Sequence, residues 1–268
     1  MGKIIAVANQ KGGVGKTTTC VNLTCALKKR GRRVLLVDCD PQGNSTSGMG
    51  VDKTATPNCY DMLMNGAATA DCIRSTKYGD VLPANMNLSG CSVELVGSEQ
   101  REYIMKTALT AVQDDYDFIL IDCPPSLGLL TVNALTAADY LLIPTMAETF
   151  AASGITQLYD TYKSVKKYTN PALRIDGVLL TRTERTRVTR TIQELTEKIA
   201  DYMGADVYRT TIRSNVIIKE AQAVQENVFD YIESKAQTKG ERVSEASRNF
   251  VNDCLNFVKE FVEKEREQ

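Results

Sequence analysis

The fold is decided by the stretch Gln10-Lys11-Gly12-Gly13-Val14-Gly15-Lys16-Thr17-Thr18. It follows a short apolar run, Ile4–Ala8, and precedes an amphipathic pattern over Thr17–Arg30, which together predict a strand, a glycine-rich turn and a helix. Glycine lets the backbone turn tightly and aim consecutive N–H groups at one point, where the helix N-terminus adds partial positive charge. The stretch therefore predicts an anion-binding loop.

A loop of this kind after a strand is typical of nucleoside triphosphate binding. Lys16 can reach the β- and γ-phosphates, and the Thr17 hydroxyl can bind Mg²⁺. The residues expected at the nucleotide are Lys11, Gly12, Gly13, Val14, Gly15, Lys16, Thr17 and Thr18. The strict pattern G-x-x-x-x-G-K-[ST] fails, however, because its first glycine falls on Gln10, and a second lysine, Lys11, stands beside it.

This departure resembles the deviant Walker A motif of the partition-ATPase superfamily, which includes ParA/Soj proteins, MinD and the nitrogenase iron protein. In that superfamily the early lysine reaches across a dimer to the nucleotide of the partner subunit, and the resemblance assigns this catalytic role to Lys11. A second cation neutralises the triphosphate at full strength only when two subunits enclose it. The resemblance thus implies a homodimer in the ATP-bound state, with ATP and Mg²⁺ as ligands.

Two further apolar runs, Val34–Asp38 and Phe118–Asp122, end in aspartate. Because the chain contains no histidine, an aspartate is the plausible group to orient the attacking water. An apolar run ending in Asp122 is typical of a Walker B strand, whose carboxylate acts on Mg²⁺ directly or through water.

The sequence after Val37, Asp38-Cys39-Asp40-Pro41-Gln42-Gly43-Asn44, resembles the switch I segment of ParA/Soj proteins. That resemblance implies that Asp40 positions the catalytic water and that Asp38 supports the magnesium shell. The run from Asp122 to Leu135 is similar to switch II of the same proteins and the helix that follows it.

Apolar runs alternate with amphipathic stretches along the rest of the chain, which predicts an α/β fold: a doubly wound, mostly parallel sheet with helices on both faces. Further strands are expected at Tyr140–Pro144 and Ile175–Thr181, with a weaker one near Val207. Further helices are expected at Gln100–Val112, Leu127–Ala138, Ala151–Tyr168 and Thr191–Met203. We expect residues 1–268 to form one domain, on which a last helix at about 243–264 is docked. The region Gly50–Gly97 gives no regular pattern.

Composition excludes several classes of site. The absence of histidine removes histidine bases, histidine metal ligands and Ser-His-Asp catalysis from the 268-residue chain, whose net charge is −1. Eight cysteines without a C-x-x-C pair predict unpaired thiols in a reducing compartment. No signal peptide is recognisable and no apolar run approaches the ~20 residues that span a bilayer, so we expect a cytoplasmic protein.

Three branches of the superfamily compete. An iron–sulfur reductase component is disfavoured because Cys123 lacks a glycine-rich ligand loop around it. A MinD-like membrane-cycling ATPase would use the last helix, whose apolar stripe runs from Phe250 to Val262, as a membrane anchor. That helix carries more acidic than basic residues from Asp253 to Glu267, whereas a membrane-surface helix favours Lys and Arg. We therefore expect it to pack on its own domain, without membrane contact.

The DNA-partition branch is favoured by the switch I match and by a run of basic residues. Four arginines interleaved with threonines, and two cations further along, predict contacts with DNA phosphates: Arg182, Arg185, Arg187, Arg190, Arg213 and Lys219. Where relatives often carry arginine after the Asn-Val pair, this chain has Ile217, and contact with adenine, the dimer face or solvent alone remains the alternative for each arginine. The resemblance implies an ATP-bound dimer on non-specific double-stranded DNA, associated with the nucleoid, and a ParB-type partner that accelerates hydrolysis during plasmid or chromosome partition.

Overall fold

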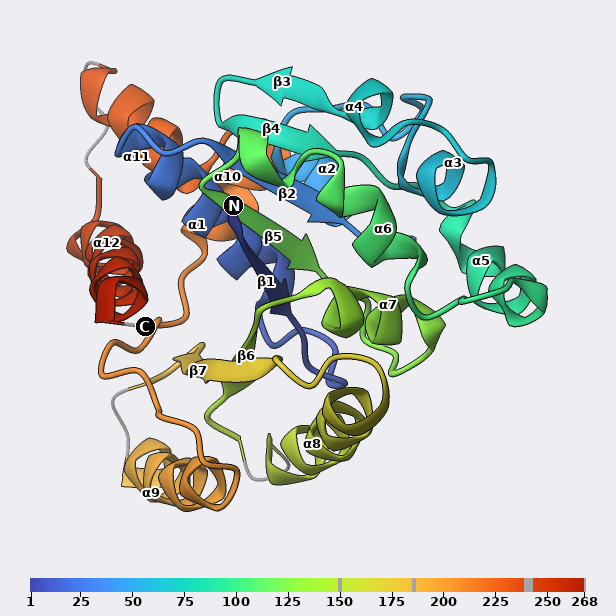
Figure 1. Ribbon diagram of the computed structural model, residues 1–268. Coiled ribbons are helices and arrows are strands. Elements are labelled where there is room, and N and C mark those ends of the chain that lie inside the picture. The colour runs from blue at the N-terminus through green and yellow to red at the C-terminus, as the bar shows by residue number, and fades with distance from the viewer. Residues whose placement is uncertain (149–150, 185–186, 239–242, 268) are drawn as a thin grey trace.

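The strands form a single open sheet in the computed structural model, which describes residues 1–148, 151–184, 187–238 and 243–267 (Figure 1). Within those residues seven strands lie in the order β3-β4-β2-β5-β1-β6-β7. Their bounds are β1 Lys3–Val7, β2 Val34–Asp38, β3 Arg74–Thr76, β4 Gly79–Leu82, β5 Phe118–Asp122, β6 Tyr140–Met146 and β7 Arg174–Thr181. All neighbours pair in parallel except β3 and β4, which confirms the predicted doubly wound, mostly parallel sheet.

Helices cover both faces of this sheet (Figure 1). The face that carries α1, α10, α11 and α12 opposes the face that carries α3, α5, α6, α7 and α8. The helices are α1 Lys16–Lys29, α2 Asn44–Gly48, α3 Cys59–Met64, α4 Thr69–Cys72, α5 Leu88–Glu94, α6 Ile104–Thr110, α7 Leu129–Ala137, α8 Ala151–Tyr168, α9 Arg187–Tyr202, α10 Ile217–Ala223, α11 Val228–Gln237 and α12 Glu245–Glu267. Short 3₁₀ turns follow α5 at Leu95–Gly97 and α6 at Gln113–Asp115.

Alternation along the central strands divides the interior into two cores. On β1, Ile4 and Ala6 belong to one hydrophobic cluster, and Ile5 and Val7 belong to the other. Successive side chains of a strand point to opposite faces, so a strand that is apolar at every position must be covered on both sides. The chain bends from this rigid centre into the phosphate loop directly after Val7.

The region Gly50–Gly97 holds elements that the sequence analysis did not assign. It contains the β3–β4 hairpin and three short helices, α3, α4 and α5, none longer than seven residues. Elements of this length are too short to display a helical or strand period. The expected strand near Val207 is a single parallel bridge to Val178, and α6 is shorter at both ends than the expected Gln100–Val112.

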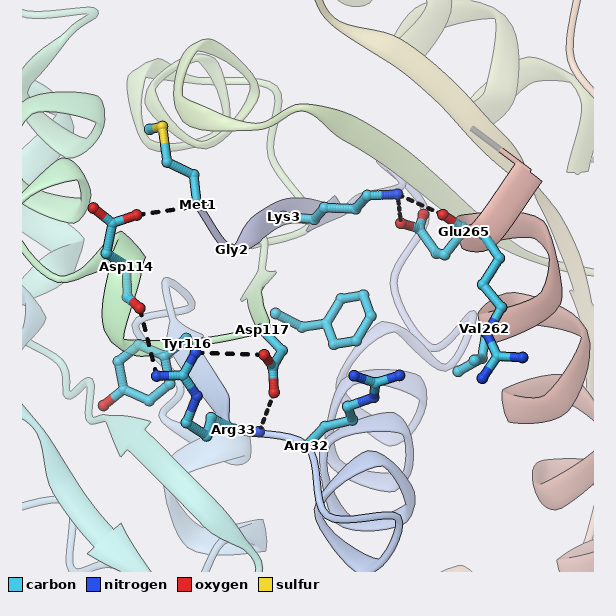
Figure 2. Close-up of a pocket in the computed structure, with 12 residues that line it drawn as sticks. Met1, Gly2, Lys3, Arg32, Arg33, Asp114, Tyr116, Asp117, Val262 and Glu265 are labelled. Atoms are coloured by element: carbon cyan, nitrogen blue, oxygen red, sulfur yellow. Dashed lines mark hydrogen bonds and ion pairs between the residues drawn. The ribbon is translucent and has the colours of Figure 1, made fainter.

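The last helix, α12, packs its apolar stripe on the sheet. Phe250, Phe257 and Phe261 are buried in the same cluster as strand residues of β1 and β5, and the Phe261 ring lies 5.7 Å from that of Phe118. At the end of α12, Lys3 Nζ contacts the Glu265 carboxylate at 2.5 Å (Figure 2). None of the helices in the described residues is both long enough and apolar enough to cross a membrane.

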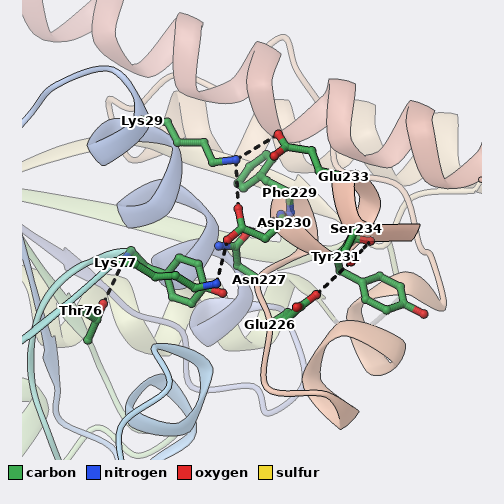
Figure 3. A network of polar contacts seen from close by, with 11 residues as sticks. Lys29, Thr76, Lys77, Glu226, Asn227, Phe229, Asp230, Tyr231, Glu233 and Ser234 are labelled. Atoms are coloured by element: carbon green, nitrogen blue, oxygen red, sulfur yellow. Dashed lines mark hydrogen bonds and ion pairs between the residues drawn. The ribbon is translucent and has the colours of Figure 1, made fainter. Parts of the chain in front are cut away.

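Helix α11 is fixed beside the end of α1 by a cap and an ion-pair cluster (Figure 3). The Asn227 side chain accepts hydrogen bonds from the N–H groups of Phe229 and Asp230, which satisfies two of the unpaired donors at the start of the helix. The Asp230 carboxylate lies 3.1 Å from Lys29 Nζ on α1 and 3.2 Å from Lys77 Nζ in the β3–β4 hairpin.

All eight cysteines are buried and unpaired, which confirms that they are free thiols. Burial raises the pKa of the Cys25 thiol to about 12, so this group behaves as a small apolar side chain.

Candidate functional site

The predicted site residues converge at the carboxyl ends of the central strands. Asp38 and Asp122 are neighbours in the β2–β5 ladder, and Val7, the last residue of β1, pairs with Asp122 on its other side. The loop between β1 and α1 therefore begins beside both carboxylates. In an open parallel sheet this edge is where ligands bind.

The phosphate loop is held at its start by Asn9. The Asn9 amide donates to the Pro144 carbonyl at 2.8 Å, and its oxygen accepts from the Lys11 N–H at 3.0 Å. Gly13 and Gly15 have φ angles of 76° and 87°, a region that favours glycine. Gly15 is the N-cap of the 14-residue helix α1 and supplies no side chain to its first N–H groups, which leaves those donors for a ligand.

Lys16 is 7% exposed, and its Nζ lies 3.3 Å from the Lys11 carbonyl oxygen, across the mouth of the loop. Burial lowers the pKa of the Lys16 ammonium, and the nearby charge of Asp122 opposes that shift. An anion within the loop would satisfy this buried cation.

The two strand-end carboxylates are bonded differently. Asp122 Oδ2 accepts from the hydroxyls of Thr17 at 2.8 Å and Ser45 at 2.7 Å, whereas its Oδ1 is buried without a partner among the described residues. Asp38 accepts from the N–H and hydroxyl of Thr46, both at 2.7 Å, and from the Asp40 N–H at 3.1 Å. Burial raises the pKa of both Asp122 and Asp38.

This donor set fits a magnesium site of the P-loop type. A hydroxyl on Thr17 and an unbonded oxygen on Asp122 lie together, and Mg²⁺ prefers such oxygen ligands with several waters retained. The described residues contain no cluster of three or more acidic or cysteine side chains that could hold a metal ion by themselves. The contacts of Asp38 join it to Thr46 and to the Asp40 backbone rather than to Thr17.

Asp40 lies in a tight turn beyond β2. Its Oδ1 accepts from the Gln42 N–H at 2.9 Å. Burial dominates the pKa shifts of Lys16 and Asp122, and the nearby charge of Asp40 opposes the lowered pKa of Lys16 and adds to the raised pKa of Asp122. The turn closes through Gly43, which has a φ of 61° and at which a Cβ would stand 2.7 Å from the Ala84 carbonyl oxygen. Any other residue at position 43 would displace the turn and with it the Asp40 carboxylate.

Lys11 lies at the outer rim of the loop, where its Nζ forms an ion pair with Glu148 at 2.5 Å. Its side chain is 31% exposed and that of Glu148 is 49% exposed. Helix α8 lies close beneath, because a Cβ at Gly154 would be 3.6 Å from the Lys11 Cβ.

The six predicted DNA cations are dispersed. Arg182 lies against the phosphate loop, with Nη1 3.5 Å from the Gly13 carbonyl oxygen. Arg213 forms a two-pronged ion pair with Asp253 of α12, with distances of 2.6 and 2.9 Å. Arg190 on α9 and Lys219 on α10 are exposed, whereas Arg185 and the side chain of Arg187 lie outside the described residues.

Sequence reasoning missed four polar residues of this site. Ser45 and Thr46 directly follow the quoted switch I segment, so extending that match by two positions would have found them. Asn9 lies at the first turn of the phosphate loop, and Glu148 lies at its rim. No local sequence pattern predicts either contact.

Comparisons with known proteins agree with this geometry. A family model described as an AAA domain matches residues 2–175. The sporulation initiation inhibitor protein Soj of Bacillus subtilis is 50% identical over 224 residues, which cover 82% of this chain and 88% of Soj. The chromosome partitioning protein ParA of Myxococcus xanthus is 41% identical over 240 residues, covering 88% of this chain and 84% of that protein.

Solved structures with the same fold include nucleotide complexes. Cobyrinic acid a,c-diamide synthase from Mycobacterium smegmatis with bound ADP and magnesium is 36% identical, with a TM-score of 0.75 over 91% of this chain and 99% of that one. McdA from Cyanothece superposes with a TM-score of 0.82 at 21% identity over 98% of this chain and 100% of that one, a likeness of fold. The chain therefore belongs to the ParA/Soj family of P-loop partition ATPases, as the deviant loop, the neighbouring strand-end aspartates and these relatives together show.

Proposed function

We propose that the protein is a DNA-partition ATPase that binds ATP with Mg²⁺, forms a nucleotide-enclosing homodimer and holds non-specific double-stranded DNA in that state. The observation that carries the proposal is the second loop lysine, Lys11, which lies at the partly exposed rim and pairs there with one carboxylate, Glu148, among the residues that the structure describes. A cation in this position can leave Glu148 for the more highly charged triphosphate of a second subunit. The names of two relatives, a chromosome partitioning protein ParA at 41% identity and a chromosome-partitioning ATPase Soj at 45% identity, support the partition role.

In this proposal, the residues of the phosphate loop and of the strand ends each have a separate role in binding and hydrolysing ATP. The loop N–H groups and Lys16 bind and orient the phosphates, and Thr17 and Asp122 supply the oxygen atoms that would hold Mg²⁺. Bound Mg²⁺ neutralises charge on the β- and γ-phosphate oxygens. Asp40 orients the attacking water, and Asp38 fixes the backbone of Asp40 and Thr46 around it.

Release from DNA follows hydrolysis, which a ParB-type partner accelerates in our proposal. The ATP-bound dimer would associate with the nucleoid within the cytoplasm, and it would return to monomers after hydrolysis in each cycle. The protein would in this way move a plasmid or chromosome origin.

The proposal is tested by two pull-downs of the full chain with ATP, with ADP and without nucleotide, one on a non-specific DNA duplex and one on anionic liposomes. We expect the protein to be retained on DNA with ATP, but not with ADP or without nucleotide. Retention on liposomes without DNA binding would instead support the MinD-like alternative. Asp40→Ala should accumulate an ATP-bound dimer on DNA, and unchanged turnover in that variant would contradict the role of Asp40.

A further inference from the structure

Thr181, the last residue of β7, and Arg182, which follows it, lie against the outer side of the phosphate loop. Thr181 is 3% exposed, and its hydroxyl is 2.7 Å from the Val14 carbonyl oxygen and 3.1 Å from that of Thr145. A hydroxyl carries one proton, and the shorter contact is to the loop. The Arg182 guanidinium lies 3.5 Å from the neighbouring Gly13 carbonyl oxygen.

The two contacts fall on consecutive peptide planes of the loop. In a trans peptide the carbonyl oxygen and the following N–H lie in one plane and point in opposite directions. A group that holds the Val14 carbonyl outward therefore fixes the direction of the Gly15 N–H, and a group on the Gly13 carbonyl fixes that of Val14. In the part of the chain that the structure describes, neither N–H has an acceptor.

The backbone of Arg182 is also unusual. Its φ of 51° lies in the left-handed region that residues other than glycine rarely adopt. The side chain reaches back over the loop, where Nη1 also lies 3.7 Å from the Met146 sulfur. Among the predicted DNA cations whose side chains the structure describes, Arg182 is the one whose guanidinium contacts the nucleotide loop.

We propose that Thr181 and Arg182 are positioning residues of the phosphate loop, which orient the Gly15 and Val14 N–H groups toward the phosphates, and that Arg182 belongs to the nucleotide site rather than to a DNA surface. This inference rests on the proposed ATP site, but not on DNA binding or dimerisation. A loop whose donors are oriented before the ligand arrives needs no rearrangement on binding.

Thr181→Val tests the first half, because it removes the hydroxyl and keeps the side-chain shape. Displacement of a fluorescent ATP analogue by ATP and by inorganic tripolyphosphate should show both binding about tenfold more weakly. Thr181→Ser restores the hydroxyl and should recover most of the loss. The decisive comparison is between the two ligands. If the affinity for tripolyphosphate falls as much as the affinity for ATP, the lost interaction acts on the phosphates and not on the base.

The matched control is Thr69→Val. Thr69 is another buried threonine, 4% exposed, whose hydroxyl donates to the Ala108 carbonyl at 2.7 Å, far along the sheet from the loop. It should lose thermal stability as Thr181→Val does, yet bind tripolyphosphate like the wild type. Wild-type affinity in Thr181→Val, or an equal loss in both valine variants, would overturn the inference.

Arg182→Gln tests the second half. Its nucleotide affinity should fall about threefold, while the slope of log DNA affinity against log salt stays at the wild-type value. If the slope instead falls by the amount expected for about one phosphate contact and the nucleotide affinity is unchanged, Arg182 contacts DNA and the inference is wrong. If the wild type binds ATP but no DNA, the proposed partition function fails while the nucleotide measurements still decide this inference.

Discussion

Lys11 and Glu148 make an ion pair that the proposed dimer must break. Both side chains are partly exposed, at 31% and 49%, so the pair is worth at most about 1 kcal/mol. This energy is small compared with the interaction of an ammonium group with an enclosed triphosphate. The pair therefore favours the position of the Lys11 side chain beside Glu148 but does not prevent it from moving to the nucleotide of a second subunit.

Glu148→Gln removes the charge that Lys11 must leave. We expect ATP-dependent dimerisation to become up to about fivefold tighter, as measured by sedimentation with a non-hydrolysable ATP analogue.

Lys11→Ala should abolish both the dimer and hydrolysis. A Lys11→Ala protein that dimerises and turns over normally would remove the basis of the proposed dimer.

The elements of the fold differ in how well the sequence predicts them. Strands β2 and β5 appear at the predicted residues because each is a continuous apolar run closed by aspartate. The β3–β4 hairpin was not predicted, since β3 is three residues long and carries no apolar pattern. Likewise, the local motif locates Thr17 and Asp122, but the Glu148 contact depends on β6 returning beside β1, which no local pattern encodes.

Helix α12 contributes apolar burial that a single substitution can measure. Phe261 is fully buried between Phe118 and Phe257, so Phe261→Ala should lower the free energy of unfolding by about 3–5 kcal/mol. Leu255→Ala on the same helix, where Leu255 is 39% exposed, should cost less than about 1 kcal/mol. Urea denaturation gives both values, and similar losses would mean that the stripe of α12 is not packed as described.

A buried carboxyl group beneath α12 gives stability a pH dependence. Burial raises the pKa of Asp176 to about 6, although Tyr208 donates to it and Lys264 lies nearby. An unfolded aspartate titrates near pH ~3.9, so the folded state holds the proton more tightly and its stability falls as pH rises from about 4 to about 6.

Asp176→Asn has no such charge to bury. Relative to this variant, the wild type should lose up to about 3 kcal/mol of unfolding free energy between pH ~4 and ~6.5 and stay level above that range. Urea titrations at a series of pH values measure the difference. A difference that does not change with pH would mean that Asp176 titrates normally.

At the scale of the whole molecule, the proposed DNA surface must come from local charge, because the net charge of the chain is −1. Each phosphate that a cation neutralises adds about 0.9 to the slope of log affinity against log salt. We expect Arg190→Gln to lower that slope by about one contact. Lys163→Gln, on the exposed side of α8, should leave it unchanged.

Arg213 needs a different measurement, because its guanidinium is already occupied by Asp253. Its pairing joins the segment after β7 to α12, and the N–H of Arg213 donates to the same carboxylate. Arg213→Gln is therefore expected to reduce stability by about 1 kcal/mol whatever its effect on DNA. A fall in the salt slope in addition would identify a second role.

The contact between Lys3 and Glu265 places the beginning of the chain beside its end (Figure 2). Both lie at the edge of the sheet opposite the phosphate loop, because β1 runs from Lys3 toward that loop. A short peptide could therefore link the region of Lys3 to that of Glu265, so a circular permutant of this fold, with its break in an exposed turn, should still fold. A fluorescent label attached near Lys3 or Glu265 would thus lie at the end of β1 away from the phosphate loop and Lys11, where the proposed dimer would form.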